Sequence, residues 1–235
     1  MRYRYLLFDA DNTLFDFDRA EEAAFYAAFS ACGLTPDARA YALYHQINHV
    51  MWQKLERGEI SRERLKTLRY ELLLQELNLP DAGKSQELSN MYFCQLSKQS
   101  VLYKGAEDVC RILSTYYKLY IVTNGMYETQ TSRIRASAVH PYFSGIYISE
   151  KVGAAKPDRA FFDYVMQDIG CPDPSVYCVI GDSLTSDIEG ANRAGMDAVW
   201  LCHGENSDTQ GRIFRHILKD IRDLPDYLKR QEQKT

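Results

Sequence analysis

Two acidic residues near the amino terminus, Asp9 and Asp11, directly follow a short apolar run and could serve in catalysis or metal binding. The run, Tyr5–Phe8, consists of strand-favouring residues, and its continuous hydrophobicity predicts a strand covered on both faces. Carboxylates at the end of such a strand add nothing to a core, whereas ligands bind at the carboxyl ends of strands in open α/β sheets. The acids therefore predict a site, although together with Thr13 they could also form an ordinary turn.

Further polar side chains follow other predicted strands in the second half of the chain. Thr123 and Asn124 end one strand, where a hydroxyl and loop amides could bind an anion. Asp182 ends another strand, and Asp187 follows five residues later at the start of a predicted helix. Lys156 lies between these two segments, immediately before a proline that restricts the local backbone. These residue types are suited to the chemistry of phosphate groups.

If these strands share one sheet, Asp9, Asp182 and Asp187 should converge at one edge. Three uncompensated carboxylates would repel one another there. A bound Mg²⁺ would remove this problem, because it prefers oxygen ligands and commonly takes one or two carboxylates with waters and a substrate phosphate. We therefore expect a Mg²⁺ site among the aspartates.

The elements that would position these residues alternate regularly from about residue 105 onward. Alternation of helix and strand predicts a doubly wound parallel sheet, to which the first strand also belongs. Besides residues 5–8, strands are predicted at residues 119–123, 146–149, 176–180 and 199–201. Helices are predicted at residues 106–116, 129–138, 158–169, 186–194 and 224–230.

The segment between the first strand and this alternating region has helical periodicity throughout. Four amphipathic helices without an intervening strand predict a small bundle inserted into the α/β fold. We expect residues 1–15 and 100–235 to form the α/β core domain and residues 16–99 the helical domain.

Local signals mark where the inserted helices begin and end. Gly33 can end the first helix, Thr35 followed by Pro36 is typical of the start of the second, and Ser61 precedes the third.

Composition excludes several classes of protein. The chain has 235 residues, a formal net charge of −4 and no long block of one sign, so we expect neither a nucleic-acid partner nor an anionic membrane. No apolar run reaches the roughly 18 to 20 residues of a membrane-spanning helix, and a strand stands where a signal peptide would. We therefore expect a cytoplasmic protein with reduced cysteines, and the sequence gives no indication of its oligomeric state.

In order and spacing, the segments DADNT, TN, KP and GDSLTSD resemble the four signature motifs of the haloacid dehalogenase-like (HAD) phosphatase superfamily. The resemblance covers nearly all of the chain outside the helical insertion, which resembles that superfamily's cap. The segments FDADNTLFDF, ISEKVGAAKP and IGDSLTSDI are similar to a subgroup, the pyrimidine 5′-nucleotidases of the YjjG/YfnB type. Asn12 stands where glycine is frequent in the superfamily, and Asn tolerates left-handed geometry.

The resemblance implies roles for the matching residues. Asp9 would be the nucleophile that forms an aspartyl-phosphate, and Asp11 the acid that protonates the leaving alcohol and then deprotonates water. Lys156 would neutralise the transferring phosphoryl group.

The same resemblance implies the ligand-binding residues. Mg²⁺ would be held by Asp9, by the backbone carbonyl of Asp11 and by Asp182, with Asp187 in support. Thr123 and Asn124 would bind the phosphoryl oxygens.

The residues of the helical insertion that would select a substrate are less clearly marked. Phe17 and Trp52 could contact the substrate, and Tyr44 is a further aromatic candidate, although packing within the bundle is the commoner role. His203 and Glu205 follow the last predicted strand and could border the site, although a surface loop is the simpler interpretation.

The resemblance implies a Mg²⁺-dependent phosphomonoester hydrolase whose substrate is a small phosphorylated metabolite, a pyrimidine nucleoside 5′-monophosphate. A phosphatase or phosphomutase for sugar or other metabolite phosphates remains an alternative on the same core. A dehalogenase needs no leaving-group acid, so Asp11 argues against it. A non-catalytic nucleotide- or protein-binding module would be expected to lack one essential group. This chain has all of them: Asp9, Asp11, Lys156 and Asp182.

Overall fold

The structure, a computed structural model, describes residues 2–203 and 213–232. The chain forms two compact units. One comprises the residues up to Phe17 together with those from Ser100 onward, and the other comprises Asp18–Gln99. The first is called the core unit below and the second the helical unit, and each is described separately.

The core unit contains a parallel sheet of six strands in the order β3-β2-β1-β4-β5-β6. This confirms the predicted doubly wound α/β fold. The last strand was not predicted, because its three residues are too few to show a periodic pattern. The strands are β1 (Tyr5–Phe8), β2 (Lys118–Thr123), β3 (Phe143–Ile148), β4 (Tyr177–Gly181), β5 (Asp197–Leu201) and β6 (His216–Leu218).

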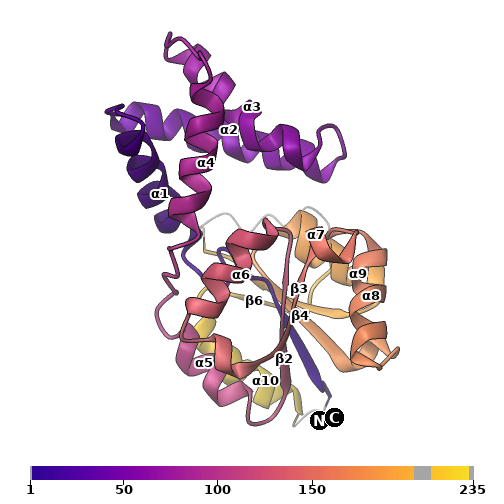
Figure 1. The fold of residues 1–235 in the computed structure, drawn as a ribbon. Helices are drawn as coiled ribbons and strands as arrows, with labels where there is room; N and C mark the ends of the chain where they lie inside the picture. Colours follow the sequence, from indigo (N-terminus) through magenta and orange to yellow (C-terminus); the bar gives the residue numbers. More distant parts are fainter. Residues whose placement is uncertain (1, 204–212, 233–235) are drawn as a thin grey trace. The chain divides into compact units, whose positions relative to one another are not determined.

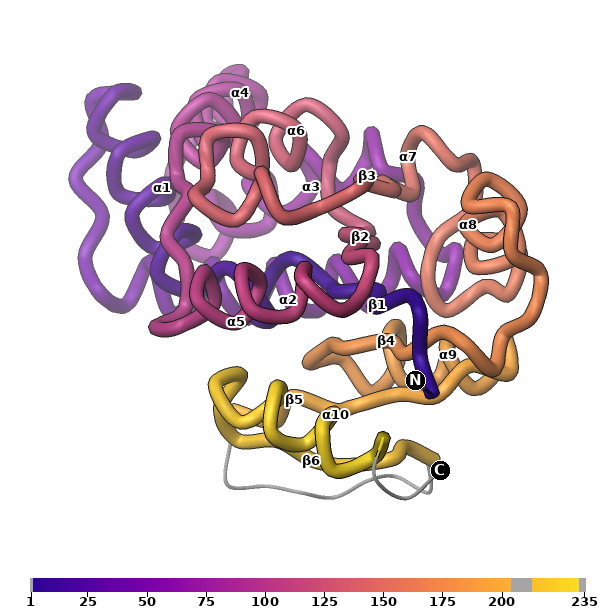
Figure 2. Tube along the Cα trace, turned by 90° about the horizontal axis from the view of Figure 1, so that it is seen from below, coloured from indigo at the N-terminus to yellow at the C-terminus, as the bar shows by residue number. Residues whose placement is uncertain are grey.

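Helices cover both faces of this sheet (Figure 1). Leu6 and Phe8 of β1 pack into the apolar cluster that includes residues of α5, α6 and α10. Tyr5 and Leu7 pack into the opposite cluster with α8 and α9. The carboxy-terminal helix α10 runs beside α5 (Figures 1 and 2). The helices are α5 (Ala106–Leu113), α6 (Tyr127–Ala136), α7 (Ser149–Val152), α8 (Arg159–Ile169), α9 (Glu189–Ala194) and α10 (Leu224–Glu232).

Short helical turns complete the core unit. They are the 3₁₀ turns η1 (His140–Tyr142), η2 (Pro174–Val176) and η4 (Ile221–Asp223) and the π-helical turn η3 (Leu184–Ile188). The π turn precedes α9, where a single helix was predicted from residue 186.

The order of the strands reverses at β1, which lies between β2 and β4. Phe8 is in register with Ile121 on one side and with Ile180 on the other. The backbone N–H of Asp9 donates to the carbonyl of Ile180 at 2.9 Å, so the pairing continues one residue beyond β1. Because ligands bind where the strand order reverses, this edge of the sheet is the expected place for a site.

The helical unit is built from four helices without a strand among its residues, all of which the structure describes. Ser61 accepts a hydrogen bond from the N–H of Arg64, which confirms its predicted place before the third helix. The predicted start of the second helix at Thr35 and Pro36 is wrong, because Asp37 caps the helix by accepting from Ala40 N–H at 2.8 Å. The helices are α1 (Phe17–Ala31), α2 (Ala38–Glu56), α3 (Arg62–Glu76) and α4 (Lys84–Leu96).

The interior of the helical unit is aromatic, with a buried guanidinium at its centre. The Arg69 guanidinium carbon lies 4.7 Å from the ring centre of Tyr92 and 5.2 Å from that of Tyr70. Tyr44 is fully buried against Tyr70, with 5.4 Å between the ring centres. Tyr44 therefore packs the bundle. None of the helices in the described residues has the length and apolar character needed to cross a membrane.

Candidate active site

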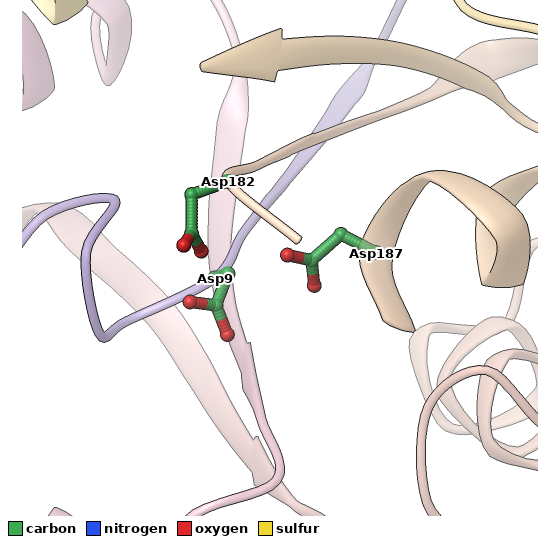
Figure 3. A group of neighbouring side chains, drawn as sticks. All are labelled: Asp9, Asp182 and Asp187. Atoms are coloured by element: carbon green, nitrogen blue, oxygen red, sulfur yellow. The ribbon is translucent and has the colours of Figure 1, made fainter. Parts of the chain in front are cut away.

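Carboxylates from separate segments meet at the carboxyl ends of β1 and β4. Asp9 directly follows β1, Asp182 follows β4, and Asp187 lies in the π turn η3. One oxygen atom from each of the three side chains lies within 4.8 Å of the others. Figure 3 shows the three groups pointing toward one another. The structure therefore brings together the side chains that the sequence predicted to converge.

Lys156 carries the positive charge closest to this cluster. Its ammonium group donates to Asp9 Oδ1 at 2.5 Å, to Asp187 Oδ1 at 2.7 Å and to the carbonyl of Val122 at 2.8 Å. Because an ammonium group has three N–H donors, these partners use all of them. Lys156 therefore acts on the site through its charge and by fixing the positions of Asp9 and Asp187.

The electrostatics of the cluster favour a bound cation. Burial raises the pKa of Asp9 to about 7, even though the charge of Lys156 opposes this rise. Desolvation and the neighbouring charges of Asp9 and Asp187 raise the pKa of Asp182 well above its usual range. One lysine cannot balance three carboxylates, and a cluster of carboxylate oxygens supplies the hard ligands that Mg²⁺ prefers. The residues present therefore fit such an ion.

Local contacts hold Asp182 and Asp187 in place. A Cβ atom at Gly181 would lie 2.3 Å from Asp187 Cγ, so the absence of a side chain there makes room for this carboxylate. The N–H of Ser183 donates to Asp187 Oδ2 at 3.1 Å. The indole N–H of Trp200 donates to the backbone carbonyl of Asp182 at 2.8 Å. Hydrogen bonds from Ser183 and Trp200 therefore fix the segment after β4 that carries Asp182 and Asp187.

Thr123 and Asn124 lie at the end of the neighbouring strand β2. The buried hydroxyl of Thr123 accepts from Gly125 N–H and from Gln130 Nε2, both at 3.2 Å, which leaves its own hydrogen to donate. The Asn124 amide pairs with the backbone of Lys156, donating to its carbonyl at 2.8 Å and accepting from its N–H at 2.9 Å. Asn124 thus ties the lysine segment to the end of β2, a role that the sequence did not reveal.

The carboxylate of Asp11 is held by helix α6. Arg133 Nη1 lies 2.6 Å from Asp11 Oδ1, and Gln130 Nε2 lies 2.5 Å from Asp11 Oδ2. Neither residue was predicted from the sequence. Gln130 and Arg133 share the buried face of α6 with Ile134, where polar residues require a partner, but this burial is apparent only in the folded structure.

The turn between Asp9 and the start of α1 is fixed by Asn12. Its φ of 56° is left-handed, as the sequence predicted it could be, and its side chain accepts from Phe17 N–H at 3.1 Å. The His203 imidazole contacts the Asn12 carbonyl at 2.7 Å and stacks on Tyr103 with 4.5 Å between ring centres. His203 is therefore an exposed residue that packs against the turn after β1, whereas Glu205 lies outside the described residues.

The predicted substrate-contact residues lie in different units. Phe17 is half-buried and belongs to the core unit, where the Arg133 guanidinium carbon lies 5.6 Å from its ring centre. Trp52 is half-buried on α2 of the helical unit.

Comparison with known proteins identifies the family. Residues 3–195 match the family model described as a haloacid dehalogenase-like hydrolase. Pyrimidine 5′-nucleotidase PynA of Streptococcus pneumoniae is 36% identical over 202 residues, which cover 85% of this chain and 84% of PynA. Pyrimidine 5′-nucleotidase YjjG of Escherichia coli is 31% identical over 228 residues, which cover 97% of this chain and 99% of YjjG.

A solved structure shows the same similarity. The magnesium-bound structure of the HAD-hydrolase YfnB of Bacillus subtilis superposes with a TM-score of 0.90 and 33% identity, covering 97% of this chain and 99% of that one. Taken together with the acidic cluster at the end of β1, these similarities show that the chain belongs to the haloacid dehalogenase-like hydrolase family.

Proposed function

We propose that the protein is a Mg²⁺-dependent phosphomonoester hydrolase that acts through an aspartyl-phosphate on pyrimidine nucleoside 5′-monophosphates. The observation that carries this proposal is the pair of carboxylates after β1. Asp9 lies in the acidic cluster beside Lys156, whereas Asp11 is held separately by Arg133. Two neighbouring carboxylates in different environments suit two different roles, a nucleophile and a proton-transfer group.

The reaction would proceed in two steps. An ionised Asp9 oxygen attacks phosphorus, the bond from phosphorus to the ester oxygen breaks, and that oxygen takes a proton from Asp11. In the second step Asp11 takes a proton from water as the water oxygen attacks phosphorus, and the bond from phosphorus to the Asp9 oxygen breaks. Inorganic phosphate leaves, and both carboxyl groups return to their starting states.

The remaining site residues would bind the phosphoryl group. Thr123 would donate its hydroxyl hydrogen to a phosphoryl oxygen, beside the backbone N–H of Asn124, and Lys156 would contribute its charge. Mg²⁺ would be held by Asp9 and Asp182.

The backbone carbonyl of Asp11 would complete the protein's ligands for the ion, with Asp187 supporting them through Lys156. When bound, Mg²⁺ would offset negative charge on the phosphoryl oxygens.

The helical unit would serve as a cap that selects the substrate and excludes water from the site. The boundary near Phe17 suits this division, since the catalytic carboxylates precede it and the helical residues follow it. The magnesium-bound YfnB structure reveals interdomain movement in that protein, which supports a mobile cap here. Phe17 and Trp52 remain the candidates for contact with the substrate.

The choice of substrate rests on PynA and YjjG, whose names describe pyrimidine 5′-nucleotidases. A glyceraldehyde 3-phosphate phosphatase of Methanopyrus kandleri is 29% identical over 215 residues, 88% of this chain. A small sugar phosphate is therefore the second substrate class to be tested.

The test is phosphate release from uridine 5′-monophosphate, thymidine 5′-monophosphate, adenosine 5′-monophosphate and glyceraldehyde 3-phosphate, with Mg²⁺ or with EDTA. We expect release from the pyrimidine nucleotides that requires Mg²⁺ and is lost in Asp9→Asn. Asp163→Asn is the matched control, because Asp163 is an exposed residue of α8, and it should retain full activity.

Each part of the proposal can fail separately. Release that persists in EDTA or in Asp9→Asn would exclude the mechanism. Release from glyceraldehyde 3-phosphate alone would exclude the nucleotidase assignment and leave the hydrolase assignment intact.

A further inference from the structure

Helix α6 reaches the Asp11 carboxylate with two side chains that lie three residues apart. Arg133 Nη1 is 2.6 Å from Oδ1 and Gln130 Nε2 is 2.5 Å from Oδ2, so each carboxylate oxygen has its own donor. Residues at this spacing share one face of a helix. Arg133 Nη1 also lies 3.3 Å from Gln130 Oε1, which aligns the two donors with each other.

Both donors are buried, which distinguishes this arrangement from a chance contact between surface side chains. Arg133 is 1% exposed and Gln130 is 2% exposed, although both are polar. Placing a guanidinium in the interior costs several kcal/mol unless a charged partner compensates it. Arg133 forms an ion pair with Asp11, whose side chain is 25% exposed. The buried Arg133 thus holds the more accessible carboxylate of Asp11 in place.

Neighbouring residues restrict the motion of both donors. The Arg133 guanidinium carbon lies 5.1 Å from the ring centre of Phe15 and 5.6 Å from that of Phe17, within the range of cation–π contact. A Cβ atom at Gly125 would lie 2.3 Å from Gln130 Nε2, so the glycine leaves the space through which Gln130 reaches Asp11.

We propose that Arg133 and Gln130 are positioning residues that fix the direction of the Asp11 carboxylate toward the leaving-group oxygen. The inference rests on the proposed function, in which Asp11 exchanges a proton with that oxygen. A carboxylate oxygen has two lone pairs, so each donor uses one and leaves the other for the substrate. Fixing the orientation of a reacting group in advance lowers the entropic cost of reaching the transition state.

The test compares esters whose leaving groups differ in their need for a proton. p-Nitrophenolate is a weak base and leaves unprotonated, whereas the 5′-alkoxide of uridine is a strong base and needs an acid. In Arg133→Met and Gln130→Met we expect kcat/KM on uridine 5′-monophosphate to fall by about 10²-fold, within the range of general acid catalysis. On p-nitrophenyl phosphate we expect kcat/KM to change little, because this ratio reflects only the steps up to departure of the leaving group and leaves out the hydrolysis of the aspartyl-phosphate that both esters share.

Two further variants separate positioning from folding. Arg135→Met is the matched control, because Arg135 lies on the exposed side of the same helix, and it should behave as the wild type on both esters. Arg133→Lys keeps the charge with a single donor group and should recover part of the activity on uridine 5′-monophosphate. Circular dichroism and thermal unfolding show whether each variant is folded.

The outcomes distinguish the inference from the function on which it rests. Equal losses of kcat/KM on the two esters, or wild-type activity of Arg133→Met on both, would overturn the positioning role while the hydrolase assignment stands. A wild-type protein that releases phosphate from neither ester would overturn the proposed function, and the positioning role with it.

Discussion

Lys156 Nζ lies 2.7 Å from Asp187 Oδ1, and both side chains are only 1% exposed. The same ammonium group lies 2.5 Å from Asp9 Oδ1. One buried lysine therefore joins the segment after β1 to the segment after β4. Because the lysine compensates two buried carboxylates, its removal should affect the stability of the core unit as well as catalysis.

The first prediction concerns Lys156→Met in the absence of Mg²⁺. The change leaves the carboxylates of Asp9 and Asp187 buried without their cation, so we expect the free energy of unfolding to fall by about 3 kcal/mol. Urea denaturation in EDTA at neutral pH measures this difference. Lys104→Met replaces an exposed lysine and should change the free energy of unfolding by less than about 0.5 kcal/mol. Equal stability of the two variants would show that the buried pairs contribute nothing.

A second prediction concerns the space beside Asp187. In Gly181→Ala the new Cβ would lie 2.3 Å from Asp187 Cγ, so the carboxylate must move from the position in which it accepts from Lys156. We expect overpacking to lower the free energy of unfolding by about 2 kcal/mol and phosphatase activity to fall with it.

A double-mutant cycle with Asp187→Gly tests this explanation. In that background the Asp187 side-chain atoms nearest to the new Cβ, including Cβ at 2.5 Å, are absent, so Gly181→Ala should have less effect, with a coupling energy of at least about 1 kcal/mol. Additive losses would mean that Gly181 is required for another reason.

The sequence could predict Asp9 and Asp182 because each directly follows an apolar strand, and a parallel sheet brings such strand ends to one edge. The adjacency of β1 and β4 was not predicted. It depends on which strands pair, as Phe8 does with Ile180, and periodicity along one chain carries no information on pairing.

Gln130 and Arg133 could not be predicted for a related reason. Helical periodicity predicts that polar residues face solvent, whereas the partner of Gln130 lies 119 residues away in sequence, in a turn that only the folded sheet brings close.

The start of α2 shows that even a local feature, the first residue of a helix, can be mispredicted from the sequence. Thr35 with Pro36 and Asp37 are both plausible helix starts, and the choice between them depends on the packing of the bundle.

A third prediction concerns the pH dependence of stability at Asp197 on β5. Although burial opposes it, hydrogen bonds from Tyr3 and Arg215 keep the pKa of Asp197 below its ordinary value. A lowered folded-state pKa adds stability above the unfolded-state pKa, and this contribution is lost as pH falls through the folded-state value. Asp197→Asn should therefore lower the free energy of unfolding by about 1 kcal/mol at neutral pH, and the difference should shrink as pH falls below the ordinary pKa of an aspartate, about 3.9.

Urea denaturation at neutral and acidic pH measures this effect. Asp163→Asn, which changes an exposed residue with a single surface partner, should show almost no difference at either pH. A loss in Asp197→Asn that is the same at both pH values would show that the charge of Asp197 is not what stabilises the fold.

The fourth prediction concerns the competition between protons and Mg²⁺. Burial raises the pKa of Asp9 to about 7, so the metal-free folded protein retains a proton there that the unfolded chain has already released. Metal binding requires the ionised carboxylate, so the ion must displace this proton below neutral pH. Asp9 alone should make the affinity for Mg²⁺ rise about tenfold from about pH 6 to about pH 8, and the raised pKa of Asp182 should add to this rise.

Isothermal titration calorimetry in buffers of different ionisation enthalpy measures both the affinity and the proton release. Near pH 6 we expect protons to be released as Mg²⁺ binds, from Asp9 and from Asp182, whose pKa is also raised, and we expect the release to decrease by about one proton as pH rises to about 8, because Asp9 is then ionised already. Asp163→Asn should reproduce the wild-type curve, since Asp163 is exposed and lies on α8. Mg²⁺ affinity that does not change with pH, without proton release, would mean that Asp9 is ionised throughout this range and that Lys156 outweighs burial at this carboxylate.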